Sequence, residues 1–232
     1  MSQTDSFLIR HGTVVDGTGE AAHRADVRVT DGVITEIGEG LEPVAGERQY
    51  DAEGCIVAPG FIESHTHYDG AMWWDDRLDP LPGYGATTQV MGNCGFATAP
   101  LSDDEAARRE VVKIFSFFED IPEAPFIESL PWDWRSWPEY RDSMVEKVRV
   151  PLNYAVYCGH IALRLAAMGV EAWERAASPA EVDAMARMLD EAMQAGAMGL
   201  SSNLMDHDGE DRPVPSLKAD DAEFRALFEV LD

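Results

Sequence analysis

The sequence is poor in basic residues, and this shortage argues against two classes of partner. Of its 232 residues, 18 are lysine or arginine and 43 are aspartate or glutamate, so the formal net charge is −25. A surface this acidic repels a phosphate backbone and an anionic lipid surface. We therefore expect neither a nucleic acid nor a membrane as a partner.

Cysteines and long apolar runs are also scarce. The chain has three cysteines, Cys55, Cys94 and Cys158, and so small and odd a set argues against a disulfide framework. No stretch approaches the roughly 18 consecutive apolar residues that a membrane-spanning helix needs. The first five residues are polar and lack the basic start of a signal peptide. These features predict a soluble protein of the reducing cytoplasm.

The rest of the composition is that of a globular protein, with 45% hydrophobic and 26% charged residues. Residues 1–54 contain short runs with strand periodicity, and Asp31-Gly32 is a strong hairpin turn between two of them. We expect these residues to form a β-structured domain, followed by a second domain over residues 55–232.

The second domain has the alternation of strands and helices that is typical of a parallel α/β fold. Apolar runs predict four strands, at residues 55–64, 86–91, 152–157 and 197–201. Helices are predicted to begin near residues 102–105, 178–181 and 220, and the second of these has a serine cap, a proline and a glutamate at capping-box spacing. An aromatic segment at residues 122–138 is either a lid or simple packing. Four strands make a small open sheet or the first half of an eight-stranded barrel, so we expect a truncated chain.

The strongest chemical signal is His65-Thr66-His67, directly after the first apolar run. Residues two apart on an extended chain face the same way, so the two imidazoles converge at the end of the strand. Imidazole nitrogens suit Zn²⁺ and similar ions. A pair of polar residues at a strand end is the alternative interpretation.

Further polar residues follow the other predicted strands. Cys94 lies in Gly-Asn-Cys-Gly after the second strand, where its thiolate can join the same metal. We interpret Cys55 and Cys158 as small apolar residues instead. His160 ends the third strand and Ser201 the fourth, and both are candidates for supporting a ligand or contacting substrate.

At this point the chain resembles the N-acyl-D-amino-acid deacylases, or D-aminoacylases, of the amidohydrolase superfamily. The resemblance lies in five stretches that keep the family's order: residues 12–19, 58–67, 92–95, 159–160 and 196–202. Residues 60–67, Gly-Phe-Ile-Glu-Ser-His-Thr-His, are typical of the superfamily, and Asn-Cys-Gly points to the deacylase branch. Residues 203–209 lack the family's tyrosine, which predicts a divergent subgroup.

The resemblance implies a β-sandwich, represented by residues 1–54, and the first half of a (β/α)8 metallo-dependent hydrolase barrel. It implies that His65, His67 and Cys94 bind one or two Zn²⁺ ions. Asp69 is expected either to orient a ligand histidine or to be a solvated acid of the loop. Further histidine ligands and the catalytic aspartate of the family would lie beyond Asp232. Other branches use a carboxylated lysine, but the three lysines here do not end a predicted strand.

The expected activity is hydrolysis of a non-peptide linear amide in a small-molecule substrate by a metal-activated water. Two alternatives stay open: a cyclic amidohydrolase of the dihydroorotase or hydantoinase type, and an inactive fragment or non-catalytic metal-binding module.

Overall fold

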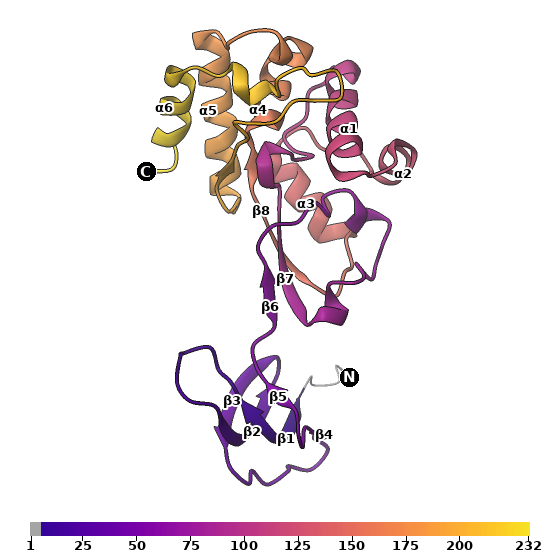
Figure 1. Ribbon diagram of the computed structural model, residues 1–232, viewed down its shortest axis with the longest axis vertical. Coiled ribbons are helices and arrows are strands. Elements are labelled where there is room, and N and C mark those ends of the chain that lie inside the picture. Colours follow the sequence, from indigo (N-terminus) through magenta and orange to yellow (C-terminus); the bar gives the residue numbers. More distant parts are fainter. Residues whose placement is uncertain (1–5) are drawn as a thin grey trace. The chain divides into compact units, whose positions relative to one another are not determined.

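The computed structural model describes residues 6–232, and two compact units divide the chain, one ending at Gly60 and the other spanning Phe61–Asp232 (Figure 1). Together they make an α/β protein. Within residues 6–232, no helix is both long enough and apolar enough to cross a membrane.

The first unit is a five-stranded sheet. Its strands are β1 (Phe7–Val14), β2 (His23–Thr30), β3 (Val33–Gly38), β4 (Arg48–Asp51) and β5 (Ile56–Val57). The order is β3-β2-β1-β4, and β5 pairs with the second half of β1. The pairs β1–β2 and β2–β3 are antiparallel, whereas β4 and β5 run parallel to β1.

The predicted hairpin turn is confirmed, because Asp31 and Gly32 both have positive φ, 52° and 78°, between β2 and β3. The apolar interior of this unit is small and centres on Val14, Ala25 and Val27. Residues 6–60 form one sheet, so the second sheet of the expected sandwich is not formed by them.

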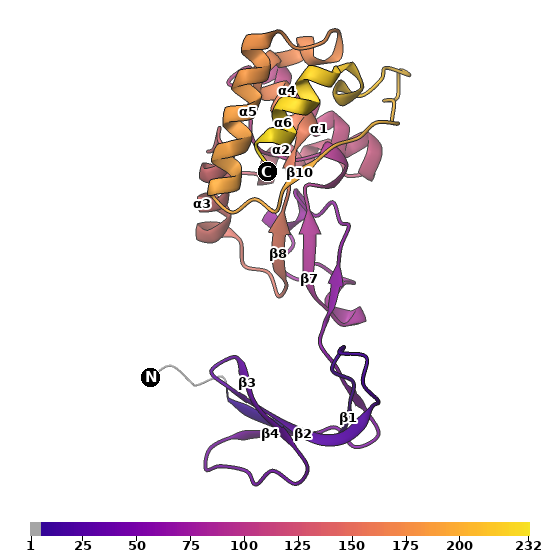
Figure 2. The same cartoon turned by 90° about the vertical axis from the view of Figure 1, so that its left-hand side faces the viewer.

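The second unit contains successive parallel strands. They are β6 (Phe61–Glu63), β7 (Ala86–Met91), β8 (Asn153–Val156), β9 (Cys158–Gly159) and β10 (Leu200–Ser201). The order β6-β7-β8 forms one ladder, and β9 pairs with β10 in a second. Strands β7 and β8 lie side by side in both views (Figures 1 and 2). Strands β6, β7, β8 and β10 fall in the four regions that the sequence predicts, whereas β9 lies just beyond the third region.

The first of the four predicted strands, over residues 55–64, is in fact two strands. Ile56 in β5 pairs with Thr13 of the first unit's sheet, while Phe61 in β6 pairs with Ala86 of the second unit. Pro59 and Gly60 lie between the two strands. Proline lacks the backbone N–H that a continuous ladder needs, so the apolar run is divided at this point.

Six α-helices accompany these strands: α1 (Glu105–Glu119), α2 (Glu123–Ser129), α3 (Trp137–Lys147), α4 (His160–Met168), α5 (Pro179–Gln194) and α6 (Asp221–Glu229). The three predicted helix starts are confirmed. The Ser178 hydroxyl accepts a hydrogen bond from the Glu181 N–H, and the Glu181 carboxylate accepts one from the Ser178 N–H. Asp104 and Asp220 cap α1 and α6 with their carboxylates, which accept hydrogen bonds from the Ala106 and Glu223 N–H groups.

Helix α4 has no clear sequence signal. Seven of its nine residues are buried, including Arg164, so it lacks the polar stripe by which an amphipathic helix is identified. The aromatic segment at residues 122–138 packs through its side chains, because Phe126, Trp134 and Trp137 are buried. Trp134 is fully buried, stacks on Trp73 with ring centroids 5.2 Å apart, and donates its indole N–H to the Thr98 carbonyl.

The contribution of the Ser178 cap to the stability of α5 can be tested by mutation. Ser178→Ala removes the hydroxyl that accepts the Glu181 N–H, so we expect the free energy of unfolding to fall by about 1 kcal/mol in urea denaturation. Ser178→Asp keeps an acceptor at the cap and serves as the matched control. Equal loss of stability in both variants would contradict the assignment.

Candidate metal centre

The three predicted ligands come from the ends of two neighbouring strands. His65 and His67 follow β6 after one residue, and Cys94 lies in a short 3-10 turn, η3 (Asn93–Gly95), that follows β7. Because β6 and β7 are paired and parallel, their carboxyl ends lie at the same edge of the sheet. In α/β barrels this edge carries the functional residues.

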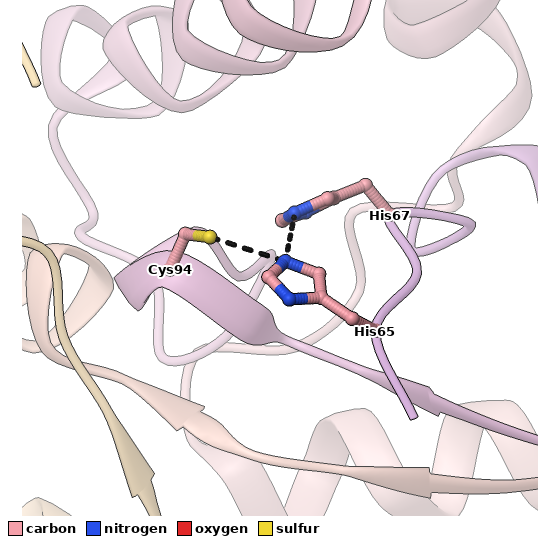
Figure 3. A group of neighbouring side chains, drawn as sticks. All are labelled: His65, His67 and Cys94. Atoms are coloured by element: carbon pink, nitrogen blue, oxygen red, sulfur yellow. Dashed lines mark hydrogen bonds between the residues drawn. The ribbon is translucent and has the colours of Figure 1, made fainter. Parts of the chain in front are cut away.

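The structure brings the three ligand atoms together (Figure 3). The Nε2 atoms of His65 and His67 are 3.3 Å apart, and the Cys94 Sγ atom is 3.2 Å from His65 Nε2. All three atoms lie within 4.8 Å of one another. Neighbouring ligands of a tetrahedral zinc ion are about 3.3–3.6 Å apart, given Zn–N and Zn–S bonds of about 2.0–2.3 Å. The spacing therefore fits a shared cation.

Hydrogen bonds to one carbonyl hold the histidine segment against β7. Thr66, between the two histidines, donates both its N–H and its hydroxyl to the Val90 carbonyl, at 3.0 and 2.9 Å. The Asn93 side-chain amide donates to the same carbonyl and to that of Thr66. Thr66 and Asn93 are buried, so the two ligand segments are joined in the protein interior.

The cysteine turn depends on left-handed backbone. Gly92 has φ 70° and Cys94 has φ 56°, a conformation that is uncommon for a residue with a side chain. A Cβ atom at position 92 would lie 2.5 Å from the Tyr157 carbonyl oxygen. Position 92 therefore requires glycine for two reasons: its φ is positive, and the backbone of Tyr157 approaches it closely.

Ser201 also holds the turn that carries Cys94. Its hydroxyl accepts a hydrogen bond from the Gly95 N–H at 3.0 Å and donates one to the Gly92 carbonyl. These two residues flank the Asn93-Cys94 pair. The structure thus places Ser201 where it positions the Cys94 segment through the backbone.

Burial sets the charge state of the ligand atoms. It lowers the pKa of His67 to about 4, with a smaller contribution from the charge of His65, so the ring is a neutral donor at pH 7. Phe96 and Phe115 pack around this ring, with centroids 5.7 and 6.4 Å away. Burial also raises the pKa of the Cys94 thiol, and the negative charges of Glu119 and Asp206 raise it further. A cation would reverse that shift and favour the thiolate.

The residues present fit a zinc ion by their chemistry. Two imidazole nitrogens and one sulfur form a donor set that Zn²⁺ prefers over Mg²⁺ or Ca²⁺, which take oxygen ligands. The remaining two cysteines lie elsewhere: Cys55 is exposed in the first unit, and burial raises the pKa of Cys158 to about 12.

Asp69 is fully buried near these ligands. Among residues 6–232, no side chain, including those of the two histidines, donates a hydrogen bond to its carboxylate. Burial raises its pKa to about 7, partly offset by the Gly92 N–H. The buried Nδ1 atom of His67 has no partner in the described chain either. The orienting role expected for Asp69 stays a prediction.

The structure places His160 in a buried polar network. Its Nδ1 atom is 2.9 Å from the Ser202 hydroxyl, and its Nε2 atom is 2.7 Å from the Glu223 carboxylate. Arg164 donates to the other oxygen of that carboxylate. Both ring nitrogens are therefore engaged, and His160 connects α4 and α6 to the residue after Ser201.

Glu119, the last residue of α1, is a site residue that sequence reasoning missed. Its Oε1 atom is 3.5 Å from His67 Nε2. Burial raises the pKa of Glu119, and the charges of Asp120 and Asp206 raise it further. The sequence signal that could have identified Glu119 is the acidic pair Glu119-Asp120 at the carboxyl end of α1, where basic residues are favoured.

Comparisons with known proteins identify the family of the chain. Residues 48–231 match the model of the amidohydrolase family. An N-acyl-D-aspartate deacylase of Alcaligenes xylosoxydans xylosoxydans is 37% identical over 198 residues, which cover 84% of this chain and 36% of that protein. A D-aminoacylase of the same organism is 34% identical over 209 residues, 87% of this chain and 39% of that protein.

A solved structure is similar throughout the chain. It is an N-acyl-D-glutamate deacylase from Bordetella bronchiseptica, complexed with zinc and a phosphonate inhibitor that mimics the tetrahedral intermediate. The sequence identity is 34% and the TM-score 0.73, over 97% of this chain and 42% of that protein. The chain therefore spans about two fifths of the length of these relatives.

The Ser201 contacts lead to one prediction. Ser201→Ala loses both hydrogen bonds to the Cys94 turn, so we expect zinc affinity to fall by about tenfold, the lower end of what supporting residues contribute. Competition with a chromophoric chelator measures the affinity. Ser216→Ala, which removes another buried hydroxyl, is the control. Equal zinc affinity in Ser201→Ala and the unmodified protein would contradict the positioning role.

The buried network around His160 leads to a second prediction. Glu223→Gln leaves Arg164 buried without its counter-charge, so we expect the free energy of unfolding to fall by about 3–5 kcal/mol in urea. Burial raises the pKa of Glu223, but hydrogen bonds from His160 and Arg164 outweigh it, so the pKa lies below 4.5. The stabilisation is thus complete above about pH 4.5 and is lost as the pH falls through the lowered pKa. Glu229→Gln, exposed on the same helix, should change little.

Proposed function

The chain belongs to the amidohydrolase family, and on that basis we propose that the protein is a metal-dependent hydrolase of a linear amide with an N-acyl-D-amino-acid-like substrate. The observation that carries the proposal is the convergence of His65, His67 and Cys94 at the carboxyl ends of two paired parallel strands. Relatives that match most of this chain are deacylases of N-acylated D-amino acids.

The position of the lysines supports the cysteine type of centre over the carboxylated-lysine type. Lys113 lies on α1 and pairs with Glu110, and Lys147 lies on α3 and pairs with Asp133. Lys218 belongs to a 3-10 turn, η5 (Pro215–Lys218). No lysine therefore ends a strand of this sheet, whereas Cys94 does follow one.

In this proposal His65, His67 and Cys94 hold one or two zinc ions, and the barrel of the family completes the fold. A bound Zn²⁺ polarises a substrate carbonyl and lowers the pKa of water at the site. The two histidines would bind it through their Nε2 atoms, which lie 3.3 Å apart. Cys94 would hold it as the thiolate, with the thiol proton released to solvent, because only the thiolate is a good ligand.

The protein's own residues keep this donor set in place. Thr66 and Asn93 bind the histidine segment to β7, and Ser201 fixes the turn that carries Cys94. The rings of Phe96 and Phe115 exclude water from one side of His67. Cysteines that are all free suit a reducing compartment, so the proposed location is the cytoplasm.

Replacement of Cys94 tests the proposal. We expect Cys94→Ala to lose most of the bound zinc, measured by elemental analysis, because the sulfur ligand is gone. Turnover is followed with N-acetyl-D-amino acids and, in parallel, with hydantoins as cyclic amides. Cys55→Ala, which removes an exposed thiol from the other unit, is the matched control.

The outcomes separate the three hypotheses. Zinc-dependent release of free D-amino acids by the unmodified protein and by Cys55→Ala, but not by Cys94→Ala, supports the deacylase. Faster hydrolysis of hydantoins than of N-acetyl-D-amino acids would indicate a cyclic amidohydrolase instead of the deacylase. Stoichiometric zinc without turnover of either substrate would indicate a metal-binding module, and unchanged zinc in Cys94→Ala would reject the site.

A further inference from the structure

A second cavity lies where α1 and α2 meet. The two helices are in contact (Figure 1), since the rings of Phe115 on α1 and Phe126 on α2 have centroids 5.0 Å apart. The cavity has a volume of about 420 Å³, which is large enough for a small organic molecule. None of the proposed zinc ligands contributes to its lining, which consists of Glu105, Arg108, Arg109, Val112, Ile127 and Trp132.

The lining contains a guanidinium without a counter-charge. Arg108 is half-buried, and among residues 6–232 its guanidinium forms neither an ion pair nor a hydrogen bond. Arg187 and Arg225 also lack such a partner in the described part of the chain, but both are exposed to water. A half-buried charge loses part of its hydration, and an opposite charge is needed to compensate for that loss. Arg108 is therefore placed to bind an anion.

The other two charged residues of the lining offset each other. Arg109 donates a hydrogen bond of 2.9 Å to the Glu105 carboxylate, one helical turn earlier on α1. The charge of Arg108 is left over, so the cavity is locally positive in a chain of net charge −25. Salt screens charges beyond about 8 Å at physiological ionic strength, so the nearest charge decides which ligand is favoured.

The apolar part of the lining is held in a strained conformation. Trp132 has φ 51°, which is an outlier for so bulky a residue, and such strain concentrates at functional and ligand sites. Its indole N–H donates to the Ile127 carbonyl at 3.0 Å, so the ring is fixed and offers a ligand only its apolar surface. The Ile127 side chain is 50% exposed beside it.

We propose that this cavity binds an organic oxyanion, a carboxylate or a phosphate carried on an apolar or aromatic body. The Arg108 guanidinium donates paired hydrogen bonds to the oxyanion, a geometry that suits both groups. The body packs against Trp132 and Ile127. The site is separate from the metal centre and does not depend on the proposed function.

The test measures binding to the metal-free protein by isothermal titration calorimetry. The probes are 4-phenylbutyrate and phenyl phosphate, which represent the two oxyanions, and 4-phenylbutyramide, which has an apolar body without the charge. Arg108→Gln removes the guanidinium, and Arg108→Lys keeps the charge without the paired donors. Arg225→Gln, an exposed arginine on α6, is the matched control for the loss of one positive charge.

We expect at least one of the two anions to bind, with affinity at least tenfold lower in Arg108→Gln and partly recovered in Arg108→Lys. Arg225→Gln and Cys94→Ala should bind it as the unmodified protein does, and the amide should bind at least tenfold more weakly. The anion should also shift the NMR signal of the Trp132 indole N–H, which is identified by its absence in Trp132→Phe.

Four results would overturn the proposal. Binding of neither anion would do so, as would equal affinity in Arg108→Gln and the unmodified protein. Loss of binding in Cys94→Ala would place the anion at the metal centre instead. A lower urea midpoint of unfolding in Arg108→Gln would show that the guanidinium stabilises the fold, whereas the proposal predicts an equal or higher midpoint because an uncompensated charge is removed.

Discussion

The second unit depends on one shared acceptor, the carbonyl of Val90 at the end of β7. Thr66 donates to it twice and Asn93 once, and all of these groups are buried. This cluster brings the segment after β6 and the segment after β7 together. Without it, the imidazoles and the thiol would belong to two independent loops, and three ligand atoms would not converge within a few ångströms.

Near this carbonyl, three residues have a backbone conformation or a charge placement that is locally unfavourable and that a purely structural protein would not need. Cys94 has a left-handed backbone, Asp69 is a buried carboxyl group without a side-chain partner, and Glu119 places a charge at the unfavourable end of a helix. Such departures from local preference concentrate at functional sites. Here all three lie close to the histidine pair, and the proposed cation would offset the electrostatic part of the cost.

The helices that complete this unit have a supporting role that differs from that of the ligands. His160, Arg164 and Glu223 form a buried network that joins α4 to α6 and contacts Ser202. Ser201, its neighbour, holds the Cys94 turn. The ligand geometry is therefore connected to the helical layer through two adjacent serines, so packing and ligand position are linked.

Features that depend on near neighbours along the chain could be predicted from the sequence. These are the capped starts of α1, α5 and α6, the hairpin at Asp31-Gly32 and the convergence of His65 and His67, because caps, turns and strand alternation act over a few residues. Only the tertiary structure decided the division of residues 55–64 between two sheets, the clamp by Ser201 and the place of Glu119. Each of these joins segments that are tens of residues apart, such as Ser201 and Gly92, and no local pattern records which distant groups will meet.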